Sequence, residues 1–199
     1  MERTWIMSAF LDLRGFGTWI YRASVSKEIK EPFIQGYLEI VQNYVKAHKD
    51  IHFKYLGDGF LAIREFSAAE KKNGAILDFI KGLRCVTRKI MRLIADCEMP
   101  PDGIRVRITA GYSYKVMVVD PCDPTRKNMV SEFIEYSINT AERLMDVNPE
   151  VVCVVTEDVA KVLKRYRSLF RMRKLGVPSC YPKSVNREDL ETLEVLKFT

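Results

Sequence analysis

The chain has 199 residues, of which 47% are hydrophobic, and its net charge is +6. This length and apolar content are enough for one well-filled core, so we expect a single domain over residues 1–199. Five scattered cysteines without a Cys-x-x-Cys pair argue against a disulfide framework or a zinc site and favour a cytoplasmic location. No run reaches the roughly 18 apolar residues that span a bilayer, so we expect no membrane partner. The excess positive charge favours an anionic partner.

The first half of the chain alternates between strand and helix patterns. Residues 4–13 have the composition of a buried strand, and apolar residues at helical spacing predict a helix over about 27–48. Two β-rich runs, IHFKYL and FLAIREF, meet at Gly57-Asp58-Gly59, where we expect a hairpin because the glycines permit positive φ. A second helix is expected over about 68–97, and the prolines of 98–103 end it.

The second half adds strands and a further helix. Residues 104–120 alternate in a way that predicts a pair of strands around a turn or bulge near Gly111. A helix over about 132–147, a strand over 151–156, a short helix over 157–166 and one or two C-terminal strands follow. The order predicts an α+β fold with a ferredoxin-like βαββαβ core, both helices on one face of an antiparallel sheet, and an extra C-terminal helix and strands.

Asp12 interrupts an otherwise apolar strand. Period-2 alternation places Ser8, Phe10 and Asp12 on one face, and a buried acid is costly unless it is paired or binds a metal. The turn of residues 15–18 then opens a helix whose backbone N–H groups could bind phosphate. The alternative is that Asp12 lies at the exposed end of the strand and that the glycines form an ordinary loop.

Asp58 lies at the tip of the expected hairpin. Asp-Gly turns are common, so Asp58 alone is well explained as a turn residue. In a ferredoxin-like sheet, however, the first strand lies beside this hairpin, so Asp12 and Asp58 could converge at one edge. Two carboxylates in that position could hold two divalent ions.

The expected helix over 132–147 carries polar side chains on one face. Glu132, Glu135, Asn139 and Arg143 are spaced by three or four residues, away from an apolar stripe. Asn139 could hydrogen-bond a sugar and Arg143 could bind a phosphate. A solvent-exposed helix face would show the same pattern. The basic run over 161–174 is explained by a solvated helix face followed by an edge strand.

Taken together, three motifs in this order resemble those of class III nucleotidyl cyclase catalytic domains. They are FLDLRGFGT (residues 10–18), KYLGD (54–58) and NTAER (139–143). The order of the motifs and the βαββαβ frame around them also match, over about residues 4–175. Each motif is weak alone, whereas the ordered set is specific.

The resemblance implies a role for each residue. Asp12 and Asp58 would bind two divalent ions, Mg²⁺ or Mn²⁺, and the backbone of Gly15, Phe16, Gly17 and Thr18 would hold the triphosphate of a nucleoside triphosphate. Asn139 would orient the ribose, and Arg143 would stabilise charge on the α-phosphate. In this family the site is shared between two protomers, so a homodimer is implied.

Base recognition would involve Lys54 and Glu132. Lys54 occupies the position of a lysine that accompanies adenine recognition in adenylate cyclases, but Glu132 stands where Asp is usual and Glu135 where Gly is expected. A further phosphate-binding lysine has only an imperfect match in Lys183. The altered pocket, in a chain that reads as a free-standing catalytic domain, resembles the pyrimidine cyclases of bacterial Pycsar anti-phage systems. The expected product is therefore cyclic UMP from UTP.

Several alternatives stay open. A cytidylate or adenylate cyclase differs only in the base, and Lys54 with Glu132 supports the latter. A diguanylate cyclase would have a similar Gly-Asp hairpin but would not explain Asn139 and Arg143. From another class, a non-catalytic basic ferredoxin-like domain could bind RNA through Phe53 and Tyr55. Nucleic acid is not the expected partner of the cyclase.

Overall fold

A computed structural model describes residues 2–72, 74–119, 129–134, 144, 152–166, 171–175 and 194–197. The first half contains β1 (Glu2–Arg14), α1 (Phe16–Tyr21), α2 (Lys27–Ala47), β2 (His52–Leu56), β3 (Gly59–Phe66), α3 (Ala68–Lys72) and α4 (Ala75–Asp96). The second half contains β4 (Gly103–Val119), β5 (Met129–Ile134), β6 (Cys153–Val155), α6 (Glu157–Leu163), a 3₁₀ turn (Lys164–Tyr166), β7 (Arg171–Lys174) and β8 (Glu194–Lys197).

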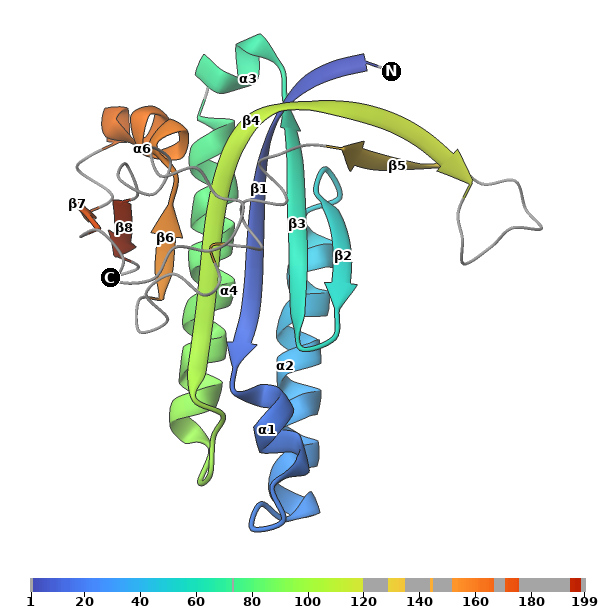
Figure 1. Ribbon diagram of the computed structural model, residues 1–199, viewed down its shortest axis with the longest axis vertical. Coiled ribbons are helices and arrows are strands. Elements are labelled where there is room, and N and C mark those ends of the chain that lie inside the picture. The colour runs from blue at the N-terminus through green and yellow to red at the C-terminus, as the bar shows by residue number, and fades with distance from the viewer. Residues whose placement is uncertain are drawn as a thin grey trace.

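The strands form one sheet in the order β2-β3-β1-β4-β6-β8-β7, with β5 paired to β4 (Figure 1). The pairs β2–β3, β3–β1 and β1–β4 are antiparallel, and β4–β6 is parallel. Strands β1 to β4 with helices α2 and α4 form the ferredoxin-like βαββαβ core that the sequence predicts. The remaining strands extend this core beyond β4, so the predicted fold class is confirmed.

One face of the sheet packs against α2 and α4, which lie side by side behind the strands in Figure 1. From β1 this face takes every second residue, and from the helices it takes the predicted apolar stripes. The cluster includes Met7, Ala9, Leu11, Leu13, Phe33, Val41, Phe60, Ala62, Ile76, Phe79, Ile80, Leu83, Val106 and Ile108, all almost completely buried.

The opposite face of the sheet is also buried but carries polar groups. Ser8, Arg107 and Thr109 are each 0% exposed, and the Ser8 and Thr109 hydroxyls are hydrogen-bonded at 2.6 Å. A small apolar cluster of Ile6, Leu61 and Ile63, with Phe10 packed against it, lies on the same face. Asp12 shares this face through its alternation with Ser8 and Phe10, as the sequence predicts.

One predicted element of the second half is wrong, and so is the predicted start of another. Residues 103–119 form one strand rather than two, because β1 pairs with β4 without interruption from Arg14↔Gly103 to Glu2↔Lys115 and Gly111 lies inside that ladder, opposite Ile6. Residues 132–134 belong to β5, opposite β4, and not to the start of a helix. The apolar spacing of this segment fits a strand hydrogen-bonded to β4 as well as it fits a helix. Most of the predicted helix over 132–147 lies outside the described residues.

Other boundaries agree with the sequence or refine it. The helix expected over 68–97 is divided into α3 and α4, since Gly74, at φ +84°, precedes α4 in a left-handed conformation. The short helix, the strand before it and a C-terminal strand are found at α6, β6 and β8. No helix in the described ranges is long and apolar enough to cross a membrane.

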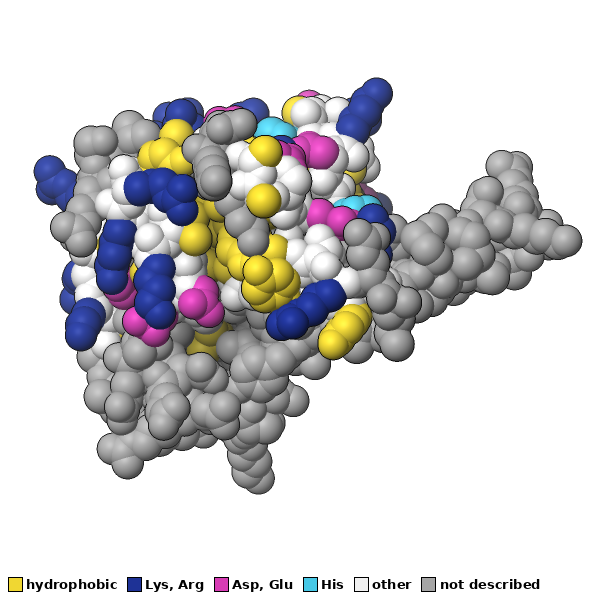
Figure 2. All heavy atoms as spheres, turned by 90° about the horizontal axis from the view of Figure 1, so that it is seen from above, with side chains coloured by type: hydrophobic (Ala, Val, Ile, Leu, Met, Phe, Trp, Pro, Cys, Tyr) yellow, Lys and Arg dark blue, Asp and Glu magenta, His cyan; other side chains and the backbone are white. Residues whose placement is uncertain are grey.

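The described parts of the basic run over 161–174 lie on a helix and on an edge strand. Lys161 forms an ion pair of 3.2 Å with Glu157 on the surface of α6, and β7 lies at the edge of the sheet. Figure 2 shows basic side chains interspersed with acidic ones on the left of the molecule.

Candidate functional site

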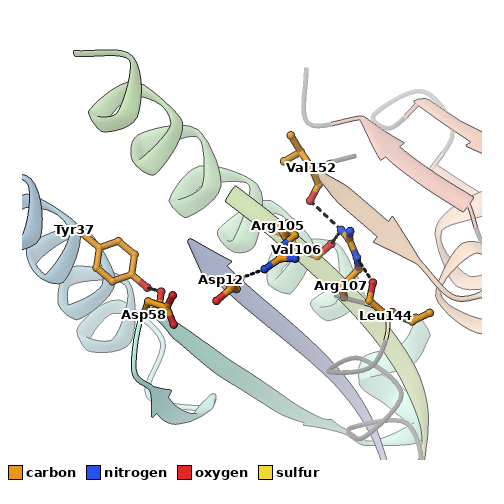
Figure 3. Close-up of polar contacts among 8 residues, drawn as sticks. All are labelled: Asp12, Tyr37, Asp58, Arg105, Val106, Arg107, Leu144 and Val152. Carbon is orange, nitrogen blue, oxygen red and sulfur yellow. Dashed lines mark hydrogen bonds and ion pairs between the residues drawn. The ribbon is translucent and has the colours of Figure 1, made fainter. Parts of the chain in front are cut away.

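Asp12 lies near the end of β1 beside Arg105 of β4. The two residues are opposite each other in the sheet, and Nη2 of Arg105 donates to Oδ2 of Asp12 at 2.6 Å (Figure 3). Their side chains are only 16% and 18% exposed. The ion pair offsets part of the cost of holding a carboxylate on a largely buried strand.

The hairpin tip places Asp58 next to this pair. A two-residue turn, Gly57-Asp58, joins β2 to β3, and Gly57 has the positive φ of 76° that only glycine adopts readily. The backbone carbonyl of Asp58 accepts hydrogen bonds from the Tyr37 hydroxyl at 3.0 Å and from the Leu13 N–H at 3.4 Å. Leu13 follows Asp12 directly, so these bonds fix the turn against the end of β1 that carries Asp12.

Gly59 lets the two strands approach each other at this point. It pairs with Asp12, and a Cβ at Gly59 would lie 2.5 Å from the Leu11 carbonyl oxygen. Of the two glycines that flank Asp58, Gly57 alone adopts a positive φ. The role of Gly59 is close approach of the backbones.

The two carboxylates act on one neighbouring group. Burial raises the pKa of the Tyr37 hydroxyl, and the negative charges of Asp58 and Asp12 raise it further. Figure 3 shows the Tyr37 ring directed from α2 toward the hairpin tip. Tyr37 is therefore a neutral hydrogen-bond donor whose hydroxyl lies within the electrostatic reach of both aspartates.

The turn of residues 15–18 lies directly after β1. Gly15, at φ +69°, precedes α1, and a Cβ there would collide with the carboxylate of Asp102. Trp19 is fully buried and its indole N–H donates to the Met99 carbonyl, which fixes α1 at the end of the sheet. Gly17 and Thr18 are exposed. These residues lie on the same end of the molecule as Asp12, and their phosphate-binding role stays a prediction.

The two predicted base-recognition residues lie on different strands. Lys54 is exposed in β2, and its register through Leu61 and Phe10 places it on the face of the sheet that carries Asp12. Glu132 lies in β5 opposite Val116. These strands do not pair with each other.

Three predicted residues lie outside the described residues: Asn139, Arg143 and Lys183. Leu144, directly after Arg143, is described and is 0% exposed. The structure therefore brings together Asp12, Asp58 and the start of α1, with Lys54 on the same face, and the roles of all these residues stay predictions.

The donor set fits a hard divalent cation. Carboxylate oxygens are the ligands that Mg²⁺ and Mn²⁺ prefer, and such ions are commonly held by one or two carboxylates together with substrate phosphates. Asp12 and Asp58 supply two carboxylates of this kind at one sheet end. In the part of the chain that is described, no three His, Cys, Asp or Glu side chains gather as a metal site. Phosphate oxygens and water would have to complete the coordination.

The RNA-binding alternative loses its support from the strand β2. Phe53 packs into the helix-side core, with its ring 5.4 Å from that of Tyr44 and 5.9 Å from that of Phe60. Tyr55 alternates with Lys54 and so belongs to the same side as Phe53. Neither ring lies on the face opposite the helices, where it was expected to stack on a base.

Three residues of this region are not among the predicted site residues: Tyr37, Arg105 and Arg107. Tyr37 was expected only as part of the apolar stripe of α2. Arg105 and Arg107 alternate with Val106 and Ile108, so two arginines on one face of a buried strand were a usable signal. Their partners depend on strand register, which alternation alone does not define.

Comparisons with known proteins agree on the fold. No protein-family model matches the chain, and no curated protein matches its sequence. Among solved structures, it is similar to the adenylyl cyclase CyaB from P. aeruginosa, with a TM-score of 0.72 and 15% identity over 98% of this chain and 95% of that chain. It is also similar to the guanylyl cyclase Cya2, with a TM-score of 0.64 and 14% identity over 98% and 91% of the two chains.

A third similar structure is the guanylate cyclase domain of RhGC from Catenaria anguillulae in complex with GTP. Its TM-score is 0.62 at 12% identity, over 99% of this chain and 98% of that chain. The alignments span nearly the whole length of each chain. The protein therefore has the fold of adenylyl and guanylyl cyclase domains, in agreement with the resemblance of its motifs.

Proposed function

We propose that the protein is a metal-dependent nucleotidyl cyclase that converts UTP to 3′,5′-cyclic UMP and pyrophosphate. The observation that carries this proposal is the placement of Asp12 and Asp58. Strand register sets Asp12 opposite Gly59, and hydrogen bonds to the Asp58 carbonyl hold the hairpin tip beside it. The turn that carries Asp58 therefore lies against the end of β1 that carries Asp12, which supports a shared role for them in a chain with the fold of adenylyl and guanylyl cyclase domains.

Each residue has a task in this reaction. Asp12 and Asp58 would hold two divalent ions, and the backbone N–H groups of residues 15–18 would hold the triphosphate. Bound ions would supply Lewis-acid stabilisation of the phosphates and a lower pKa for the ribose 3′-hydroxyl. Asn139 would orient the ribose, and Arg143 would balance the charge that develops on the α-phosphate.

The chemistry is an intramolecular phosphoryl transfer. The 3′-oxygen forms a bond to the α-phosphorus while the bond from that phosphorus to the bridging oxygen breaks, and pyrophosphate leaves. The 3′-hydroxyl proton passes to solvent. Arg105 would keep Asp12 oriented during this step, since its guanidinium already binds one carboxylate oxygen.

The proposal includes a homodimer in which each site takes its aspartates from one protomer and Asn139 with Arg143 from the other. Two-fold symmetry would then form two equivalent sites. The projecting arm of β4 and β5, which extends away from the helices in Figure 1, supports this arrangement because it offers a surface beyond the core. A monomer would lack part of each site and would be inactive.

The choice of base rests on Lys54 and Glu132 and on their departure from the purine cyclase pattern. As a pyrimidine cyclase in the cytoplasm, one domain over 1–199 would make a second messenger in bacterial anti-phage defence. Lys54 is exposed on the same face as Asp12, as a base-contacting residue requires. Cytidylate and adenylate cyclases are the neighbouring alternatives.

The decisive experiment incubates the purified protein separately with UTP, CTP, ATP and GTP, with Mn²⁺ or Mg²⁺, and identifies the products by mass spectrometry. Cyclic UMP formation that stops when EDTA is added is the expected result. Cyclic AMP or cyclic CMP as the sole product would overturn the base assignment but keep the cyclase. No cyclic product from any nucleotide would overturn the cyclase itself.

A further inference from the structure

The outer side of α4 carries a stripe of positive charge that the proposed chemistry does not use. The helix has acids at Asp78 and Asp96, and between them it has cations but no acid. Together with Cys85, the cations of this stripe line an open hollow of about 400 Å³. They are Lys81, Arg84, Arg88, Lys89 and Arg92.

The stripe points away from the sheet. Its members are three or four residues apart, so they lie along one side of the helix, over a length of about 16 Å. The opposite side of α4 belongs to the core and is at most 3% exposed at Ile76, Phe79, Ile80, Leu83, Val86 and Ile90. Asp12 and Lys54 lie on the far face of the sheet, so the stripe is a separate surface.

The neighbouring helix α2 shows what an ordinary solvated face of this protein looks like. It lies beside α4 on the same side of the sheet (Figure 1). Its exposed charges have both signs, and Lys27 forms an ion pair of 3.2 Å with Glu31. Mixed charges of this kind are typical of a helix face that only meets water.

The stripe on α4 differs from that pattern. Arg84, Arg88 and Arg92 follow one another at intervals of four residues, and like charges at this spacing destabilise a helix. Within the described ranges, no ion pair involves any cation of the stripe. Solvation explains the mixed face of α2, but it does not explain a row of charges that repel one another. An anionic partner would remove this repulsion.

The residue types and their spacing favour a phosphate backbone as that partner. The planar guanidinium of arginine binds phosphate through two parallel hydrogen bonds. One strand of a DNA duplex carries a phosphate about every 3.4 Å along the axis, so a stripe of about 16 Å spans about five of them. A helix that binds a membrane surface places its apolar side among the lipids, whereas the apolar side of α4 lies in the core.

We propose that the outer side of α4 is a nucleic-acid-binding surface that contacts the phosphate backbone and does not read the base sequence. This surface is different from the one expected at Phe53 and Tyr55, because no base has to stack on the protein. A nucleic acid on α4 leaves the face that carries Asp12 and Lys54 uncovered. The protein can therefore bind a nucleic acid and a nucleotide substrate at the same time.

The test measures binding to a labelled duplex of about 20 base pairs, DNA or RNA, by fluorescence anisotropy at several salt concentrations. The logarithm of the binding constant should fall against the logarithm of the salt concentration with a slope of about −4.5, as for about five phosphate contacts. The triple variant Lys81→Gln, Arg88→Gln, Arg92→Gln should reduce this slope to about −1.8. All three side chains are exposed, and glutamine is a good helix former, so the variant should fold.

The matched control removes the same charge from the region of α2. The triple variant Lys27→Gln, Lys46→Gln, Lys49→Gln replaces exposed side chains and should keep the slope and affinity of wild type. An equal loss in both triple variants would show that net charge attracts the nucleic acid and would overturn the inference.

Two further results would also overturn it. One is no binding to either duplex at about 50 mM salt, where phosphate contacts are strong. The other is tighter binding to vesicles that contain phosphatidylserine than to either duplex, since that would identify a membrane surface as the partner. The inference does not depend on the proposed function: a protein that binds duplexes through α4 but makes no cyclic nucleotide would refute only the cyclase.

Discussion

The two faces of the central sheet both contain buried side chains but are built from different chemistry. Toward α2 and α4, β1 presents Met7, Ala9, Leu11 and Leu13, all at most 1% exposed. Toward the opposite side, the same strand presents Ser8, Phe10 and Asp12, and β4 adds Arg105, Arg107 and Thr109. One strand therefore contributes an apolar core on one side and a hydrogen-bonded polar layer on the other.

This difference predicts that substitutions on the apolar face mainly change stability and that substitutions on the polar face mainly change activity. Burial of apolar side chains stabilises the folded state. Hydrogen bonds and ion pairs of buried charges and hydroxyls at best offset the cost of removing these groups from water. An apolar layer would have been sufficient to cover the second face. Hydrogen bonds of the polar layer join Ser8 to Thr109 and Arg105 to Asp12, so we expect this layer to fix side-chain positions rather than to add stability.

The largest effect is expected from removing a carboxylate of the polar face. Asp58→Ala should lower turnover by about 10³-fold or more, because a group that organises transition-state charge is lost. Folding should be nearly unchanged, since the hydrogen bonds from Tyr37 and Leu13 go to the backbone carbonyl of Asp58. Steady-state kinetics, thermal unfolding and gel filtration measure the three properties.

Asp50→Asn is the control for Asp58→Ala, because it removes one carboxylate elsewhere in the protein. Asp50 is 52% exposed, and its carboxylate pairs with Arg64 at 2.6 Å, away from the end of β1. It should keep full turnover. Asp12→Asn should be as inactive as Asp58→Ala, and substantial turnover in either active-site variant would refute the metal assignment.

On the apolar face, Phe79→Ala should affect stability rather than chemistry. Phe79 is 1% exposed in α4, and its ring makes an edge contact with Phe66 at a centroid distance of 6.2 Å. Truncation should lower the free energy of unfolding by about 3–5 kcal/mol. Urea unfolding measures this loss, while kcat per folded molecule should stay the same.

Met91→Ala provides the comparison on the same helix. Met91 is 42% exposed, so the change should stay within about 0.5 kcal/mol. A large loss of kcat in folded Phe79→Ala would show that the two faces are not separable in the way described.

Gly59→Ala should disturb both faces because it acts where β1 and β3 touch. The added Cβ would meet the Leu11 carbonyl oxygen and the Asp12 Cα, which are backbone atoms and cannot turn aside. We expect a loss of about 1–3 kcal/mol in stability. Turnover should fall as well, since Asp12 must move away from Asp58.

Gly36→Ala is the matched glycine substitution. A Cβ there would lie 3.1 Å from the end of the flexible Leu93 side chain, which can move, and alanine favours the helix α2. Stability should be unchanged or slightly higher. If Gly59→Ala were equally harmless, close approach of the backbones would not be what positions Asp12.

Much of the core and one part of the site could be predicted from sequence. Period-2 and helical spacing identify β1, the hairpin, α2 and most of α4, because one side of each element must be apolar. Given that topology, the approach of the hairpin tip to the end of β1 that carries Asp12 follows from the position of the hairpin beside the first strand. The prediction needed no side-chain detail, only the order of the strands.

The remaining features depend on strand pairing and register, which the sequence pattern does not define. Gly111 suggested a turn, but thirteen consecutive partners on β1 keep β4 extended through it. Residues 132–134 follow the strand that they pair with and not their own helical spacing. In the same way, alternation placed Arg105 and Arg107 on one face, whereas their contacts with Asp12 and Leu144 come from register and packing.

The smallest expected effect belongs to α3, which precedes α4 and contributes to neither the apolar core cluster nor the polar layer. The Ser67 N–H donates to the Glu70 carboxylate at 2.7 Å, and the Glu70 N–H donates to the Ser67 hydroxyl at 3.2 Å, forming a capping box. The bond from the Ser67 backbone, then that from its side chain, and finally the charge of Arg64 lower the pKa of Glu70.

Because the folded pKa of Glu70 is lower than the unfolded one, the charged form of Glu70 stabilises the fold above about pH 4.3. This contribution is lost as the pH falls through the folded pKa. Near pH 7, Glu70→Gln should therefore lower the free energy of unfolding by less than about 1 kcal/mol, given the 44% exposure of this side chain, and should lower the melting temperature slightly. The two melting curves should converge near pH 3, and a difference that grows on acidification would contradict the capping role of the charge.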